Sequence, residues 1–138
     1  MTLTLDNWHD RKDLGEVVEN PSLSQVLGAI ALLDGVARTM VSLGKPDAIG
    51  ILVAGPKDGE YIVNATLDNR EFFSLRKPHP DPEKVICFVG GQDGNYRKDQ
   101  FVSKQDCEKA VAFFYENQKL CSGLEWQKDR SDLAWHKD

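Results

Sequence analysis

The chain has 138 residues, of which 41% are hydrophobic and 28% charged, and its formal net charge is −5. This length and balance predict a single soluble globular domain over residues 1–138 and exclude an intrinsically disordered chain. No apolar run approaches the ~18 residues that cross a membrane. The N-terminus also becomes charged within a few residues, so we expect neither a membrane span nor a secretory signal peptide.

The acidic balance argues against direct binding of nucleic acid, because phosphate recognition requires a basic face. The same charge can attract a basic protein and speed the encounter, or it can serve solubility alone. Three cysteines, Cys87, Cys107 and Cys121, are odd in number and widely spaced. They predict reduced thiols and therefore a cytoplasmic protein.

The N-terminal third begins with short extended segments. Alternating leucine and threonine predict a first strand over residues 2–6, and Val17 and Val18 predict a second brief extended piece. The intervening residues 8–13 are charged and predict a loop in which only Trp8 is buried.

A first helix is predicted to start at Asn20-Pro21, since asparagine caps a helix and proline suits its first position. Apolar residues then recur at helical spacing. Two endings fit this pattern: a stop at Gly35 followed by a strand over residues 39–43, or one helix through the same residues. The Asp-Gly pair favours the stop at Gly35.

The middle of the chain predicts an antiparallel meander. Strands over residues 49–54 and 60–67 are joined by the loop 55–59, which ends in Asp-Gly. Short connections favour antiparallel pairing, because a parallel crossover needs a dozen or more residues. We expect residues 72–75 to continue the sheet and the apolar run 85–89 to form a central strand.

Residues 101–126 predict a strand end, a capped helix, a stop and a return strand. Ser103 is the expected N-cap, and Asp106 completes a capping box. Gly123 is the expected left-handed residue that ends the helix, and alternation up to Trp126 predicts a half-buried strand. The fold class is therefore α+β: an antiparallel sheet of about five or six strands with two helices packed on one face, followed by a mobile tail over residues 127–138.

Catalytic and metal-binding patterns are not found. His9, His79 and His136 are isolated, and no cysteine lies within four residues of a histidine, so we expect no metal and no cofactor. Cys107 lies in the first turns of a helix, where a thiolate could be stabilised, but packing against Val102 predicts an inert core thiol. We therefore expect a protein without enzymatic activity, with a reactive Cys107 as the catalytic alternative.

A binding surface is the remaining expectation. Two segments, 77–83 with its three prolines and 90–95 with its three glycines, predict exposed loops. Interfaces select aromatic side chains and desolvated charges, so exposed acidic and aromatic residues are the candidates, with solvated loop residues as the alternative interpretation. The candidate partner-binding residues are Asp81, Glu83, Asp93, Tyr96 and Trp135.

Several motifs carry a family resemblance. They are the hairpin GILVAGPKDGEYIV at 50–63, Val-Gly-Gly at 89–91, the capped helix ending near Glu125-Trp126, and Leu-Asp-Gly at 33–35. Together they resemble the first-numbered immunity protein family of bacterial polymorphic toxin systems. The resemblance implies an inhibitor that binds and neutralises a cognate toxin domain, often a nucleic-acid deaminase, by occluding its active site. The alternative is a small-ligand sensor or accessory domain with a pocket between sheet and helices.

Overall fold

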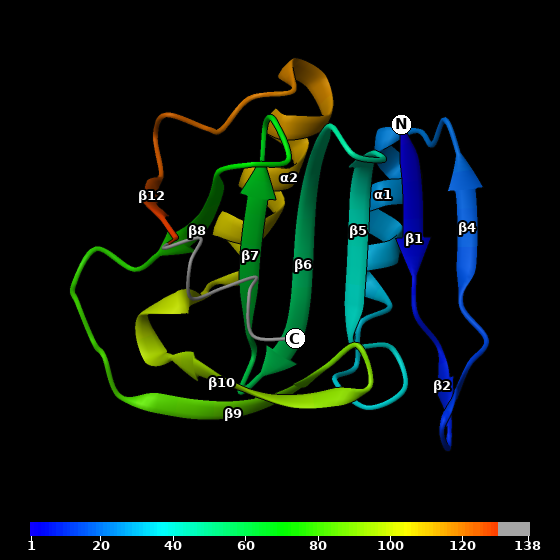
Figure 1. The fold of residues 1–138 in the computed structure, drawn as a ribbon, viewed down its shortest axis with the longest axis horizontal. Helices are drawn as coiled ribbons and strands as arrows, with labels where there is room; N and C mark the ends of the chain where they lie inside the picture. Colours follow the sequence, from blue (N-terminus) through cyan, green and yellow to red (C-terminus); the bar gives the residue numbers. More distant parts are fainter. Residues whose placement is uncertain (130–138) are drawn as a thin grey trace.

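An antiparallel sheet dominates the computed structural model, which describes residues 1–129 (Figure 1). Within that range eight strands form the sheet, so the predicted α+β class is confirmed with more strands than the five or six expected. In spatial order they are β12 (Glu125–Lys128), β8 (Phe72–Arg76), β7 (Glu60–Thr66), β6 (Ile49–Lys57), β5 (Met40–Lys45), β1 (Thr2–Leu5) and β4 (Glu16–Glu19), with β11 (Phe101–Val102) paired to the start of β7.

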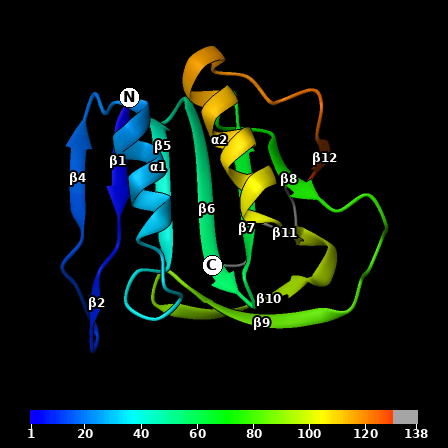
Figure 2. The same cartoon turned by 180° about the vertical axis from the view of Figure 1, so that it is seen from behind.

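The helices α1 (Leu23–Ala31) and α2 (Lys104–Asn117) cover one face of this sheet, as predicted (Figures 1 and 2). Val26 and Ile30 of α1 and Phe114 of α2 are fully buried. They form one core cluster with strand residues such as Val53 and Val63. The opposite face of the sheet carries no helix of the described chain.

The start of α1 differs from the prediction. Ser22 is the N-cap, because its hydroxyl accepts from the Gln25 amide at 3.1 Å and the Gln25 side chain accepts from the Ser22 amide at 2.8 Å. This reciprocal capping box outcompetes Asn20, which instead takes a left-handed turn with φ of 51°. The helix ends at Ala31, four residues before the predicted stop at Gly35, and β5 follows. The prediction of a break, as against one helix through residue 43, is therefore confirmed.

The end of α2 also differs. Ser103 caps the start as predicted, accepting from the Asp106 amide at 3.1 Å. Gln118, not Gly123, supplies the left-handed residue, with φ of 55° and its amide bonded to the Phe114 carbonyl at 2.7 Å. The chain then returns to β12, which includes the first two residues of the predicted tail 127–138; residues 130–138 lie outside the described range.

A second hairpin replaces the predicted central strand over 85–89 and most of the loop 90–95. It consists of β9 (Lys84–Val89) and β10 (Gln92–Arg97), which pair only with each other. Gly90 and Gly91 form the turn with φ of 60° and 88°, the positive values that a tight two-residue hairpin turn requires. The hairpin lies across the helix-free face, at the bottom of Figure 1.

This hairpin encloses a second, smaller core. Its buried members are Ala54 and Ile62 from the sheet, Cys87 from β9, and Phe101 from β11. Tyr96 of β10 adds an edge-to-face ring contact with Phe101, at a centroid distance of 6.3 Å. The helix-free face is therefore covered at one end only.

Two shorter segments also differ from the predicted loops. Residues 8–13 contain the two-stranded ribbon β2 (Trp8–His9) and β3 (Lys12–Asp13). The predicted loop 55–59 is shorter than expected, since β6 continues through Pro56 and only Asp58-Gly59 turns. The segment η1 (Lys98–Gln100) links β10 to β11.

All three cysteines are buried free thiols. Cys107 has no exposed surface, and burial raises its pKa to about 12. The core interpretation of this residue is therefore confirmed. None of the described helices has the length and apolarity needed to cross a membrane.

Candidate functional site

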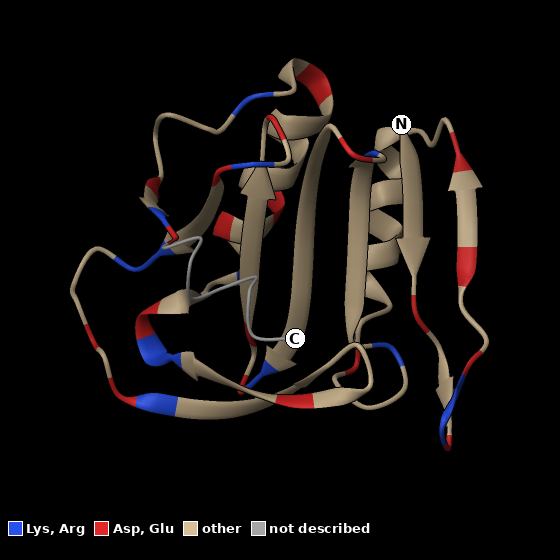
Figure 3. Cartoon of the chain, in the orientation of Figure 1, with Lys and Arg blue, Asp and Glu red and all other residues tan. Residues whose placement is uncertain are grey.

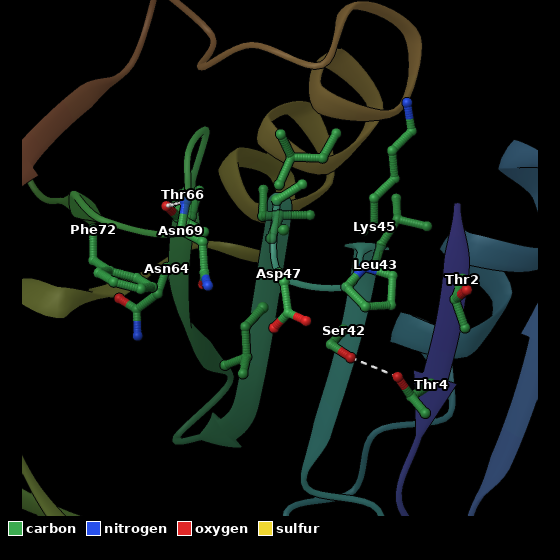
Figure 4. Close-up of a pocket in the computed structure, with 18 residues that line it drawn as sticks. Thr2, Thr4, Ser42, Leu43, Lys45, Asp47, Asn64, Thr66, Asn69 and Phe72 are labelled. Atoms are coloured by element: carbon green, nitrogen blue, oxygen red, sulfur yellow. Dashed lines mark hydrogen bonds between the residues drawn. The ribbon is translucent and has the colours of Figure 1, made fainter. Parts of the chain in front are cut away.

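A hollow of about 350 Å³ lies on the helix-free face, beyond the part that the β9–β10 hairpin covers (Figure 4). Strands β1, β5, β6, β7 and β8 provide its floor, and the turn 46–48 between β5 and β6 stands at its upper edge. The hairpin stops short of this region, because its tip is held lower down, where the Gly90 amide donates to Thr39 Oγ1 at 3.0 Å.

Two glycines without side chains create a depression in the floor of the hollow. Gly44 and Gly50 are directly opposite each other in the β5–β6 register, so neither strand places a side chain there. A Cβ atom on Gly44 would approach the Ile49 carbonyl oxygen to 2.1 Å, so backbone packing excludes any other residue. A Cβ atom on Gly50 would meet only the Leu43 carbonyl oxygen, at 3.8 Å. Folding thus does not require glycine at position 50, and its missing side chain keeps the hollow open.

Neutral polar side chains stand on two sides of a lining that is otherwise mostly apolar. On the β1–β5 side, the hydroxyls of Thr4 and Ser42 share a hydrogen bond of 2.6 Å. On the β7–β8 side, Asn64 accepts from the Ser74 hydroxyl at 3.0 Å, and its amide group lies beside Phe72 in Figure 4. Hydroxyl and amide groups on both sides can therefore hydrogen-bond an occupant, while Leu52 supplies apolar surface in the same hollow.

The two charged lining residues point in different directions. The ammonium group of Lys45 reaches away from the floor, 3.5 Å from Gln118 Oε1 at the end of α2 (Figure 4). Asp47 has φ of 61° in the turn, and its carboxylate projects over the hollow, between Asn64 and Ser42 in the view of Figure 4. The hollow therefore has a negative group at its mouth.

The residue types in the lining define what this hollow offers chemically. Its lining contains neither histidine nor cysteine, and Asp47 is its single carboxylate. Within residues 1–129, no group of three histidine, cysteine or acidic side chains is placed to hold a metal ion. What the lining offers is a set of hydrogen-bonding groups around an apolar floor, on a rigid sheet.

The structure places Asp81 and Glu83 together in the loop between β8 and β9. The Asp81 carboxylate accepts from the Glu83 amide at 3.3 Å, and Glu83 forms an ion pair of 2.6 Å with Lys98. Asp81 also lines a smaller hollow of about 270 Å³ with Lys57 and Lys77. These acidic groups are exposed, but cations lie beside them.

Asp93 and Tyr96 lie on opposite faces of β10. Asp93 is exposed on the outer face, across from Phe88 in the hairpin register. Tyr96 faces the sheet and packs on Phe101 in the second core, where burial raises its pKa. Trp135 falls outside the described residues. The structure thus separates these candidates from one another, and none of the four that it describes lines the larger hollow.

Sequence reasoning missed the residues that shape the larger hollow. A usable signal was present, since Gly44 and Gly50 are equidistant from Asp47, and the residues on either side of a hairpin turn face each other. The pairing of two glycines on an otherwise side-chain-bearing face indicates a depression. No protein-family model matches the chain, and no curated protein matches it.

Proposed function

We propose that this protein is an immunity protein of the cytoplasm, which binds and neutralises a cognate bacterial toxin domain. The proposal includes the class of toxin: a nucleic-acid deaminase or another toxin that acts on nucleic acid, held by the helix-free face. The observation that carries it is a preformed hollow on the helix-free face, whose lining offers hydrogen-bonding groups around an apolar floor. The resemblance in residues 33–35, 50–63 and 89–126 supports the same function.

Charge supports the class of partner. An enzyme that acts on nucleic acid needs a basic cleft for the phosphates. A protein of net charge −5 is attracted to such a cleft, and complementary charge raises the association rate. Asp47 and Asp68 stand in the two turns that border the hollow, and both turns carry acidic colour at the top of Figure 3. Backbone amides of Glu71 and Arg70 lower the pKa of Asp68, so this group is charged at neutral pH.

Rigidity supports tight inhibition. The hollow is built on paired strands, so little chain ordering opposes binding. Affinity would come from a few desolvated contacts at its centre, with the acidic turns at its rim steering the approach. A toxin held in this way would have its active site covered.

Co-expression tests the proposal. We expect this protein to restore growth to bacteria that produce the toxin domain encoded by the neighbouring gene, and to copurify with a catalytically inactive form of that domain. The control is the same toxin with an unrelated acidic protein of similar size, which should not restore growth. Toxicity that persists, together with no copurified complex, would contradict an immunity function.

The size of the hollow also favours a second candidate, a small-ligand-binding sensor or accessory domain. Its volume of about 350 Å³ falls at the lower end of ligand pockets, which span roughly 300–1,000 Å³. The hollow lies on the helix-free face, however, and not between sheet and helices as predicted. A metabolite screen by thermal shift separates the candidates, because a ligand at a hundred times its Kd stabilises the folded state by about 2.7 kcal/mol.

A further inference from the structure

We propose that the hollow receives one lysine or arginine side chain of the toxin domain. The aliphatic part of that side chain would lie in the depression at Gly44 and Gly50, and its cation would contact the carboxylate of Asp47. This inference rests on the proposed function for the identity of the partner, but the chemistry of the occupant follows from the lining of the site.

The arrangement of Asp47 and Lys45 indicates that the side chain bound in the hollow is positively charged. Asp47 projects over the floor, whereas the ammonium of Lys45 is turned toward Gln118. An anionic side chain in the hollow would therefore face a carboxylate, with the cation directed elsewhere. A cationic side chain would have an opposite charge at the mouth, which favours its entry and its orientation.

The polar groups fit a cation with several donors. Guanidinium has five N–H donors and ammonium three, so each needs more than one acceptor. Hydroxyl oxygens of Thr4 and Ser42 lie on one side of Asp47 in the view of Figure 4. On the other side, the Asn64 side-chain oxygen is turned toward β8, where it accepts from the Ser74 hydroxyl. The Asp47 carboxylate and the two hydroxyl oxygens thus offer acceptors beside the position where the cation would lie.

The floor fits the aliphatic part of such a side chain. Lysine and arginine bury their methylene groups along apolar surface while the charged head stays hydrated. Leu52 provides apolar surface in the hollow, and the absence of side chains at Gly44 and Gly50 leaves a depression beside it. A volume of about 350 Å³ equals that of roughly a dozen liquid waters, so a long side chain fits with water around its head.

Two substitutions test the inference in the complex with the catalytically inactive toxin domain. Asp47→Asn removes the charge and keeps the size, and we expect binding about tenfold weaker, with a smaller dependence on salt. Gly50→Leu fills the depression, and we expect binding about 30-fold weaker, as for the loss of a central contact. Isothermal titration calorimetry at two salt concentrations measures both effects.

The matched control is Asp58→Asn. Asp58 is also an exposed turn aspartate with positive φ, 53°, but it lies at the opposite end of β6. Its substitution removes the same charge from the same kind of turn, and we expect binding within twofold of the wild type. Circular dichroism and Tm check folding; because a Cβ atom at position 50 has room, Gly50→Leu should keep its Tm. If Gly50→Leu fails to fold, the binding affinities of Gly50→Ala and Asp47→Asn for the toxin domain test the inference in its place.

A smaller probe tests the site without the toxin. N-acetyl-arginine amide, titrated to tens of millimolar, should shift the NMR amide signals of Gly44 and Gly50 in the wild type and not in Asp47→Asn. N-acetyl-glutamate amide is the control and should shift these two signals in neither protein. A wild-type protein that binds no toxin would remove the proposed function. Toxin binding unchanged by Asp47→Asn and Gly50→Leu, or arginine-amide shifts unchanged by Asp47→Asn, would overturn this inference alone.

Discussion

Replacing Asp6 with alanine is expected to lower the free energy of unfolding by about 3–5 kcal/mol. Asp6 is only 5% exposed. It accepts from the amides of Thr39 at 2.6 Å and Met40 at 3.0 Å, from the Trp8 indole at 2.9 Å, and from the Thr39 hydroxyl. Alanine would leave these buried donors without an acceptor, and a buried unsatisfied polar group is costly.

The same substitution should loosen the β9–β10 hairpin, because the Thr39 hydroxyl that Asp6 holds accepts from the Gly90 amide at the hairpin tip. Urea unfolding gives the loss of stability, and hydrogen exchange at Gly90 gives the local effect. Asp93→Ala, which removes an exposed carboxylate from the outer face of the same hairpin, is the control and should change stability by less than about 0.5 kcal/mol. Equal stability of the Asp6 and Asp93 variants would refute this account of the anchor.

Local signals explain which elements the sequence predicts correctly. The Ser103 cap and the Asp58-Gly59 turn depend only on interactions with residues a few positions away in the sequence, so both can be predicted from the local sequence. The start of α1 was harder, because Asn20 and Ser22 are both good caps, two positions apart. Only the side chain of Gln25, which completes the box with Ser22, distinguishes them.

Long-range pairing explains the main error. The apolar run over residues 85–89 indicates a buried strand, and β9 does bury Cys87. An apolar run does not say which surface buries it, however, and here that surface is Ala54 and Ile62 on the far side of the sheet from the helices. The chain therefore builds a second layer, where local patterning favoured one more central strand.

The candidate site could be predicted only in part from the sequence, because it too depends on long-range contacts. Hairpin geometry around Asp47 places Gly44 opposite Gly50, which is a local inference. Whether that depression stays open depends on how far the second layer extends. That extent depends on long-range contacts such as the one between Gly90 and Thr39, which are 51 positions apart.

Replacing Asp99 with alanine is expected to lower the free energy of unfolding by about 3–5 kcal/mol, because two half-buried guanidinium groups would lose the buried carboxylate that they share. The Asp99 side chain is 4% exposed and binds Arg97 through contacts of 3.0 and 2.7 Å and Arg76 at 3.2 Å. It also accepts from the Asp81 amide at 2.8 Å. The carboxylate thereby joins β10, β8 and the loop 77–83.

The control is Glu60→Ala, which breaks the ion pair between Glu60 and Lys77. These two side chains are 36% and 40% exposed, so the substitution should lower the free energy of unfolding by less than about 1 kcal/mol.

The Asp99 cluster also predicts a pH dependence of stability. Hydrogen bonds from the Arg97 guanidinium hold the pKa of Asp99 at about 2, against 3.8 for an ordinary aspartate, although burial alone would raise it. Because the folded state has the lower pKa, its carboxylate is favoured, and this contribution is complete above pH 4 and lost as the pH falls toward 2. This difference in pKa contributes about 2 kcal/mol to the free energy of unfolding.

Urea unfolding of the wild type and of Asp99→Asn between pH 2 and 6 measures this contribution. The difference in the free energy of unfolding between the two proteins should narrow by about 2 kcal/mol as the pH falls from 6 to 2. A difference that stays constant with pH would show that the pKa of Asp99 is not lowered in the folded state, which would contradict this account of the Arg97 contacts.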